Sequence, residues 1–136
     1  MDAREDLALT RALTALPGWE WRVRMGVKES GHLATVREVY VGDWLDTHYT
    51  ELRLSRWDDD FIPAHPDYVA LDFDCATTGG HLLALLAGPV DVTRTLDADG
   101  THRWRVSDGT VQTDPAATLA RACANLAFAR GYWRAP

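Results

Sequence analysis

The chain has 136 residues, an apolar content of 46% and a charged content of 25%, which is the balance of an ordinary globular protein. That length fits one domain, which buries roughly two-thirds of its unfolded surface and needs no disulfide or metal to fold. Fourteen basic against twenty acidic residues give a net charge of −6, so we expect a protein partner rather than general nucleic-acid binding, which needs a positive face.

The sequence contains no apolar run of membrane-spanning length, so no membrane association is predicted. Its first residues, Met1 to Asp6, are acidic and lack the apolar core of a signal peptide, which predicts a cytoplasmic protein. The two cysteines, Cys75 and Cys123, lack the CxxC spacing of zinc ligands and are predicted to be buried free thiols. We therefore expect neither a metal nor a cofactor.

The first half of the chain predicts a helix followed by strands. Apolar positions at helical spacing predict a helix over residues 2–15, which Pro17 and Gly18 stop. Strict alternation over residues 19–27 predicts a strand, and residues 33–41 return as a second strand. The apolar positions of this second strand change face, which a β-bulge or burial on both sides would explain.

The middle of the chain is less regular. Gly42 and Asp43 predict a break, and residues 47–57 predict a third strand. The acidic, proline-bearing residues 58–67 have no apolar period and predict a surface loop.

A long uncharged stretch at the centre predicts a strand running into a helix. Residues 69–73 alternate as a half-buried strand, and Asp74 stands where a helix N-cap is expected. Gly79 and Gly80 each cost a helix roughly 1 kcal/mol relative to alanine. That cost indicates either a close backbone contact or a helix that starts later.

The last third predicts a hairpin and a helix. Residues 90–96 and 101–106 are joined by a turn-rich link, and residues 110–113 predict a further short strand. Asp114 as N-cap, Pro115 in the first turn and Gly131 as C-cap delimit the last helix. The predicted fold is therefore a single α+β domain over residues 1–136, an antiparallel sheet of about five to six strands with helices packed on it in two layers.

Short motifs support a resemblance to a known class. These are the segment from Leu16 to Trp21, the aspartate-led helix from Asp74 to Leu86, the hairpin with Trp104, and the alanine- and leucine-rich residues 119–128. In this order they resemble small uncharacterised proteins encoded by phages and prophages of high-GC bacteria. The resemblance covers most of the chain except residues 33–67. It implies a phage-type origin and no established activity, so it carries over no catalytic residue.

Acidic residues and histidines in the middle of the chain form one candidate site. The segment from Asp58 to Asp74, with His48 and His65 nearby, supplies oxygen and nitrogen groups for metal binding or acid–base chemistry. Its spacing matches neither an EF-hand nor HExxH, and a run of aspartates beside prolines is more often a solvated turn. A small metal- or ligand-binding enzyme is therefore the alternative function.

Tryptophans that flank the irregular middle form the preferred candidate. Exposed aromatic residues beside acidic ones have the composition of a protein-binding hot spot. The sequence therefore predicts a non-enzymatic protein-interaction module, of phage accessory or host-takeover type, with an anti-defence inhibitor as one form. No catalytic residue is predicted, and the predicted partner-binding residues are Trp44, Trp57, Asp58, Asp59, Asp60 and Phe61.

Overall fold

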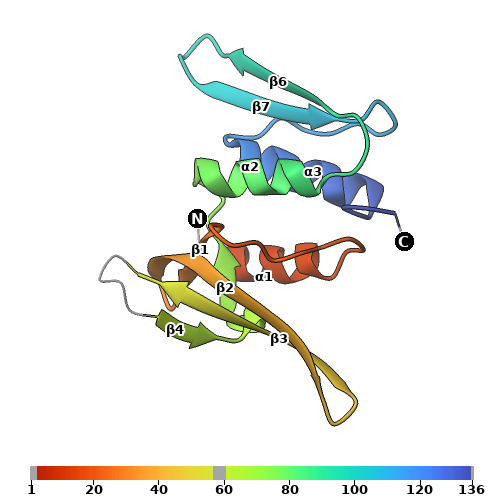
Figure 1. Cartoon of the computed structure of the whole chain (residues 1–136). Helices are drawn as coiled ribbons and strands as arrows, with labels where there is room; N and C mark the ends of the chain where they lie inside the picture. Colours follow the sequence, from red (N-terminus) through yellow and green to blue (C-terminus); the bar gives the residue numbers. More distant parts are fainter. Residues whose placement is uncertain (1–2, 57–60, 136) are drawn as a thin grey trace. The chain divides into compact units, whose positions relative to one another are not determined.

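The computed structural model of the chain describes residues 3–56 and 61–135, and its fold is α+β (Figure 1). It divides into two compact units, each made from two segments of the chain. Unit 1 comprises Met1–Arg11 and Trp21–Asp72, and unit 2 comprises Ala12–Glu20 and Phe73–Pro136. None of the helices in the described ranges is both long and apolar enough to cross a membrane.

Unit 1 is built on a five-stranded antiparallel sheet with the strand order β4-β3-β2-β1-β5. The buried side chains of β1, β2, β3 and β5 form its core, with Val27, Val36, Leu52, Leu54 and Leu71 fully buried. The strands are β1 (Gly26–Glu29), β2 (His32–Trp44), β3 (Thr47–Ser55), β4 (Phe61–Ala64) and β5 (Val69–Leu71), and a short 3₁₀ helix, η1 (Pro66–Tyr68), precedes β5.

Helix α1 (Ala3–Thr14) is bonded to the β5 edge of this sheet. The buried Thr10 hydroxyl donates a hydrogen bond to the Asp6 carbonyl at 2.7 Å and accepts one from the Leu71 N–H at 2.9 Å. Lys28 Nζ on β1 lies 3.9 Å from the buried Asp6 carboxylate. The helix therefore provides a hydrogen-bond acceptor for the Leu71 N–H, which would otherwise be unpaired at the edge strand β5.

The predicted strand over residues 19–27 was wrong for most of its length, because β1 begins only at Gly26. Arg24 has a left-handed φ of 81°, and its N–H donates to the Val36 carbonyl at 2.7 Å. A residue with a positive φ lies outside the β region and does not continue a strand. The alternation of apolar residues was real, but this turn interrupts the strand.

The change of face in the second strand was predicted correctly. Val36 pairs with Leu54 and Glu38 pairs with Arg53, so Arg37 is the extra residue of a β-bulge. Even-numbered residues before the bulge face the core, and Val39 after it pairs with the buried Leu52. The bulge thus moves the core-facing register by one residue.

Two other predictions for the middle of the chain were wrong. Gly42 and Asp43 do not break the chain but lie within β2, where Gly42 pairs with Tyr49. The predicted surface loop contains β4, which pairs with β3 in spite of Pro63. Proline is tolerated there because β4 is an edge strand.

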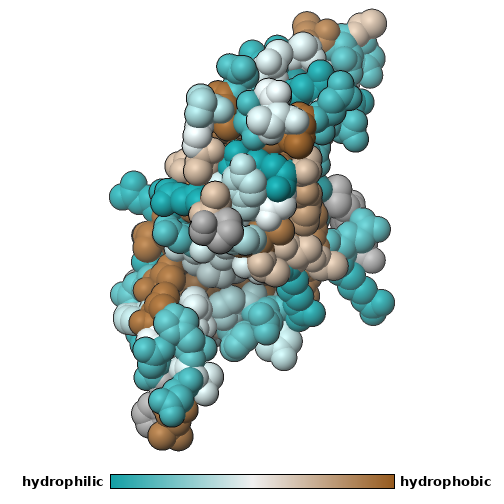
Figure 2. Space-filling view, turned by 90° about the vertical axis from the view of Figure 1, so that its right-hand side faces the viewer, coloured by the Kyte–Doolittle hydropathy of each residue, from teal (hydrophilic) through white to brown (hydrophobic). Residues whose placement is uncertain are grey.

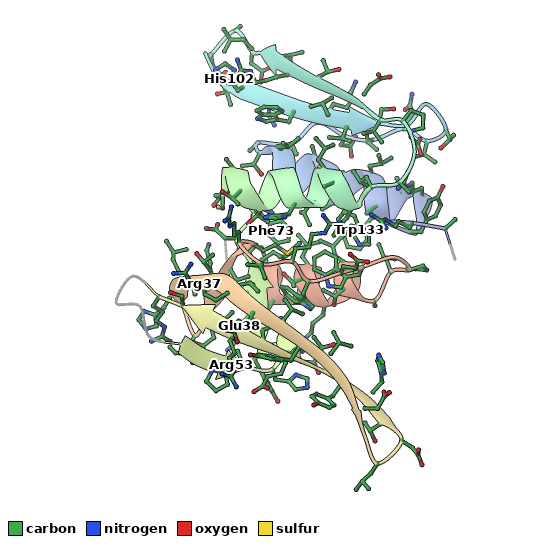
Figure 3. All side chains as sticks on the ribbon, in the orientation of Figure 1. Arg37, Glu38, Arg53, Phe73, His102 and Trp133 are labelled. Carbon is green, nitrogen blue, oxygen red and sulfur yellow. The ribbon has the colours of Figure 1, made fainter. Side chains whose placement is uncertain are left out.

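Unit 2 packs two helices against a two-stranded sheet. Figure 1 shows the β6–β7 hairpin on one side of the α2/α3 pair, and Figure 3 shows Phe73 and Trp133 on the other side. Trp133 is fully buried, and its indole N–H donates to the Leu13 carbonyl at 2.9 Å. The elements are α2 (Ala76–Leu85), β6 (Asp91–Leu96), β7 (His102–Ser107) and α3 (Leu119–Arg130).

The helix ends of unit 2 differ from the prediction. Cys75, not Asp74, is the N-cap of α2 and makes no side-chain capping bond. Thr118, not Asp114, caps α3, because its hydroxyl accepts the Arg121 N–H at 3.2 Å and donates to the Phe73 carbonyl at 2.6 Å. Gly131 is the left-handed C-cap of α3, as predicted. Residues 110–113 form no strand.

Candidate functional site

The structure does not describe the side chain of any of the six preferred partner-binding residues. Trp57, Asp58, Asp59 and Asp60 lie outside the described residues. Trp44 and Phe61 are placed by their backbones alone, at the end of β2 opposite Thr47 and at the start of β4 opposite Ser55. The prediction for these six residues therefore stays a prediction.

The described surface next to Trp44 is a two-stranded extension of the sheet, which we call the β-arm (residues 40–51). β1 pairs only with residues 32–35 of β2, and β4 pairs only with residues 52–55 of β3. Among the described residues, residues 40–44 of β2 and 47–51 of β3 pair only with each other, and Figure 1 shows their hairpin extending past β1 and β4. The β-arm positions whose burial is described are therefore exposed, except for half-buried positions at Gly42, Thr50 and Glu51.

Aromatic residues gather on the face of the β-arm that points away from the core of unit 1. Tyr40 and Tyr49 both lie on this face, since directly opposed residues share a face and Leu52 is on the other. The Tyr49 ring lies over Gly42, where a Cβ would be only 3.0 Å from the tyrosine hydroxyl. The absence of a side chain at Gly42 thus makes room for an exposed ring.

Charged residues hold Tyr40 at the base of the β-arm. The Arg53 guanidinium lies 5.0 Å from the centre of the Tyr40 ring, and Arg53 Nε is 4.0 Å from Glu38. The Tyr40 hydroxyl donates to the Glu38 carboxylate, and this hydrogen bond raises the pKa of Tyr40. Figure 3 shows Glu38 and Arg53 side by side on β2 and β3.

The tip of the β-arm carries an exposed leucine in an unfavourable backbone conformation. Leu45 and Asp46 form the two-residue turn, with φ values of 47° and 65°. Hairpin turns with two positive φ values favour asparagine, aspartate and glycine, and a leucine there is uncommon. The Leu45 side chain is nevertheless 85% exposed, and Figure 2 shows hydrophobic atoms at the lower end of the molecule, where this turn lies.

The opposite face of the β-arm is also open. Val41 is 61% exposed, and the His48 ring bonds to the Asp43 carboxylate across the strands. Apolar and aromatic side chains thus surround the tip, with charged groups beside them.

The histidines and acids of the alternative site do not come together in the described structure. His48 pairs with Asp43 on the β-arm, whereas His65 Nδ1 lies 3.7 Å from Asp67 and accepts its N–H at the start of η1. Within residues 3–56 and 61–135, no three histidine, cysteine or acidic side chains gather as a metal site would require. Asp72 and Asp74 belong to different units.

The cysteines also lie apart from a reactive arrangement. Both thiols are free, and Cys123 is buried as predicted, whereas Cys75 is half-buried. Burial raises the pKa of Cys123 to about 12, which keeps it protonated and poorly nucleophilic.

Comparison with known proteins gives no relative from which a function can be carried over. No family model, no curated protein and no solved structure matches the chain. The functional inference therefore depends on the geometry of the chain itself.

Sequence reasoning missed the β-arm because Gly42 and Asp43 were interpreted as the end of the strand. Had the strand been continued to Trp44, the opposing Thr47–Tyr49 would have left Leu45 and Asp46 as a two-residue turn. The local sequence indicates that turn only weakly, since Asp46 suits a positive φ but Leu45 does not and neither residue is glycine.

Proposed function

We propose that the protein is a non-enzymatic protein-interaction module whose contact element is the β-arm. The observation that carries the proposal is Leu45, an apolar side chain that is 85% exposed on a backbone with a left-handed φ. That conformation costs a non-glycine residue roughly 1 kcal/mol or more. Residues with a strained backbone conformation cluster at binding and active sites, and here the strained residue is also exposed and apolar.

The chemistry around Leu45 fits a protein partner with an apolar pocket. Val41, Tyr40 and Tyr49 supply further exposed apolar surface, and Glu38 and Arg53 supply a charged rim. An apolar anchor within a polar rim is the usual composition of an interface hot spot. Full burial of a leucine side chain contributes about 1.5–3 kcal/mol, which corresponds to about 10- to 150-fold in affinity.

The biological setting is proposed from sequence resemblance and composition. It is that of a phage-type accessory or host-takeover protein acting on a host or viral protein in the host cytoplasm, with anti-defence inhibition as one form. Trp44, Trp57, Asp58, Asp59, Asp60 and Phe61 are proposed as partner-binding residues from their composition alone.

The substitution Leu45→Asn separates binding from folding. Asparagine tolerates a left-handed φ, so we expect the free energy of unfolding to stay unchanged or to rise by up to about 1 kcal/mol. Binding should fall because the apolar anchor is gone. Leu33→Asn is the matched control, because Leu33 is also on β2 and 63% exposed but lies outside the β-arm.

The measurement uses a photo-crosslinking residue at position 45 or at position 33, in lysate of a high-GC bacterium. We expect one protein to be crosslinked from position 45 only, and its capture to be reduced at least about tenfold by Leu45→Asn but not by Leu33→Asn. Equal capture by wild type and Leu45→Asn, or crosslinking from both positions alike, would refute the assignment of the β-arm.

A further inference from the structure

The outer edge of β6 exposes backbone groups that pair with nothing in the described chain. On β7, the Trp104 N–H donates to the Ala116 carbonyl and the Ala116 N–H donates to the Trp104 carbonyl, both at 2.7 Å. The N–H and C=O groups of Trp104 therefore point away from β6. Arg94, which lies opposite Trp104 on β6, thus forms a non-hydrogen-bonded pair with it. Hydrogen-bonded and non-hydrogen-bonded pairs alternate along an antiparallel pair of strands, so Val92 and Leu96 are in the same position as Arg94. The N–H and C=O groups of these three residues therefore point to the open edge of β6.

The turn of the hairpin agrees with this assignment. The Asp97 N–H donates to the Thr101 carbonyl at 2.9 Å, so this pair is hydrogen-bonded and its neighbour Leu96–His102 is not. Figure 3 labels His102 at the start of β7, which marks the turn end of the hairpin.

Three other strand edges of the described chain carry devices that block pairing, whereas the edges of the β-arm do not. On β5 the Leu71 N–H is bonded to Thr10, β4 contains Pro63, and β7 is bridged by Ala116. β6 contains no proline, lysine or bulge and is exposed at all six positions. Open edges without such protection accept another strand.

The two strands of the hairpin are basic, but the turn between them adds Asp97 and Asp99, so residues 91–107 carry three arginines and three aspartates. β6 and β7 together carry three arginines and one aspartate, whereas the chain has a net charge of −6. On the outer face, Arg105 lies opposite Thr93 and Arg103 lies opposite Thr95, and these four residues line a groove of about 290 Å³.

One arginine of β7, Arg103, reaches across the hairpin toward the β6 edge. Its Nε lies 2.9 Å from the Asp97 carboxylate just beyond β6. Arg105 has no ion-pair partner among residues 3–56 and 61–135. An acidic side chain beside Thr93 would therefore meet an uncompensated guanidinium.

We propose that β6 binds an extended acidic segment of a partner protein by strand addition. The added strand pairs with the backbone of Val92, Arg94 and Leu96. Its acidic side chains lie on the outer face toward Arg105, and its apolar side chains lie on the other face beside Val92 and Leu96. This surface belongs to unit 2 and is independent of the β-arm.

The test uses a fluorescein-labelled, end-capped peptide of alternating valine and glutamate, with binding to the full chain followed by fluorescence anisotropy. We expect saturable binding that weakens at high salt. A peptide with lysine in place of glutamate tests the charge, and a peptide with alternate backbone N-methyl groups tests the strand pairing. Both should bind at least about fivefold more weakly, a factor equal to the loss of one backbone hydrogen bond.

Variants of the protein locate the site. Val92→Pro removes one outward N–H without breaking the β6–β7 ladder and should weaken binding at least about fivefold, whereas Val92→Ala keeps the N–H and should bind like wild type. Arg105→Gln should weaken binding and reduce its salt dependence without disturbing the fold. Circular dichroism checks that each variant is folded, and Leu45→Asn should leave peptide binding unchanged.

Several outcomes would overturn the proposal. They are no binding to wild type at millimolar peptide, equal binding of the lysine or N-methylated peptide, and undiminished binding by folded Val92→Pro or Arg105→Gln. Tighter binding of a single-stranded oligothymidylate than of the acidic peptide would also overturn it, since the arginines would then serve nucleic acid.

Discussion

Replacing Gly79 with alanine should destabilise the protein, whereas the same change at the adjacent Gly80 should stabilise it. Both glycines lie inside α2, so each substitution gains the same helix propensity of about 1 kcal/mol. Gly80 is exposed, and a Cβ there would have no atom within 4 Å. The full propensity gain should therefore appear as added stability.

Gly79 is different because α3 lies against it. A Cβ at Gly79 would be 3.2 Å from the backbone nitrogen of Ala120 and 3.2 Å from the Cβ of Leu119. A backbone atom cannot move without shifting α3, and overpacking of this kind costs about 1–3 kcal/mol. After the gain in propensity, Gly79→Ala should lower the free energy of unfolding by about 0–2 kcal/mol. The two variants should thus differ by about 1–3 kcal/mol.

Urea unfolding followed by far-ultraviolet circular dichroism measures this difference. The dependence of the unfolding free energy on urea, the m value, should not change. The urea concentration at the unfolding midpoint should rise for Gly80→Ala and fall or stay level for Gly79→Ala. Equal stabilisation by both substitutions would refute the reasoning, because the two helices would then not be in close contact at Gly79.

Two further predictions concern ionisable groups of unit 2. Hydrogen bonds from Thr110, and next the Arg130 guanidinium, lower the pKa of Asp108 from 3.8 to about 2. The resulting stability is present above pH 3.8 and is lost as the pH falls through about 2, so Asp108→Asn should lower the urea midpoint at pH 6 and have little effect near pH 2. For the thiols, a maleimide reagent at neutral pH should label Cys75 and leave the buried Cys123 unmodified until the protein is unfolded, which mass spectrometry of labelled peptides checks. Labelling of both thiols at equal rates in the folded protein would contradict the buried position of Cys123.

Periodicity and turn residues predicted the α+β class and most elements, because these signals are local. The change of face at Arg37 was visible as a shift in the apolar positions of β2. For Gly79 the sequence left open a close backbone contact or a later helix start, and the structure shows the contact, with Leu119 and Ala120.

The failures arose where a non-local contact decided the local structure. Arg24 adopts a left-handed φ while its N–H pairs with Val36, which no pattern of neighbours reveals. Thr118 outcompetes Asp114 as the cap of α3 because its hydroxyl also bonds to the distant Phe73 carbonyl. The candidate binding surface was missed for the same reason, since Leu45 becomes a tip residue only through the pairing of β2 with β3.

The assembly of unit 2 from Ala12–Glu20 and Phe73–Pro136 has a consequence for synthesis. The carbonyls of Leu13 and Pro17 accept hydrogen bonds from Trp133, so this early segment cannot complete its contacts until residue 133 has been synthesised. A fragment that begins at residue 73 would therefore contain Trp133 without the two carbonyls that accept its hydrogen bonds.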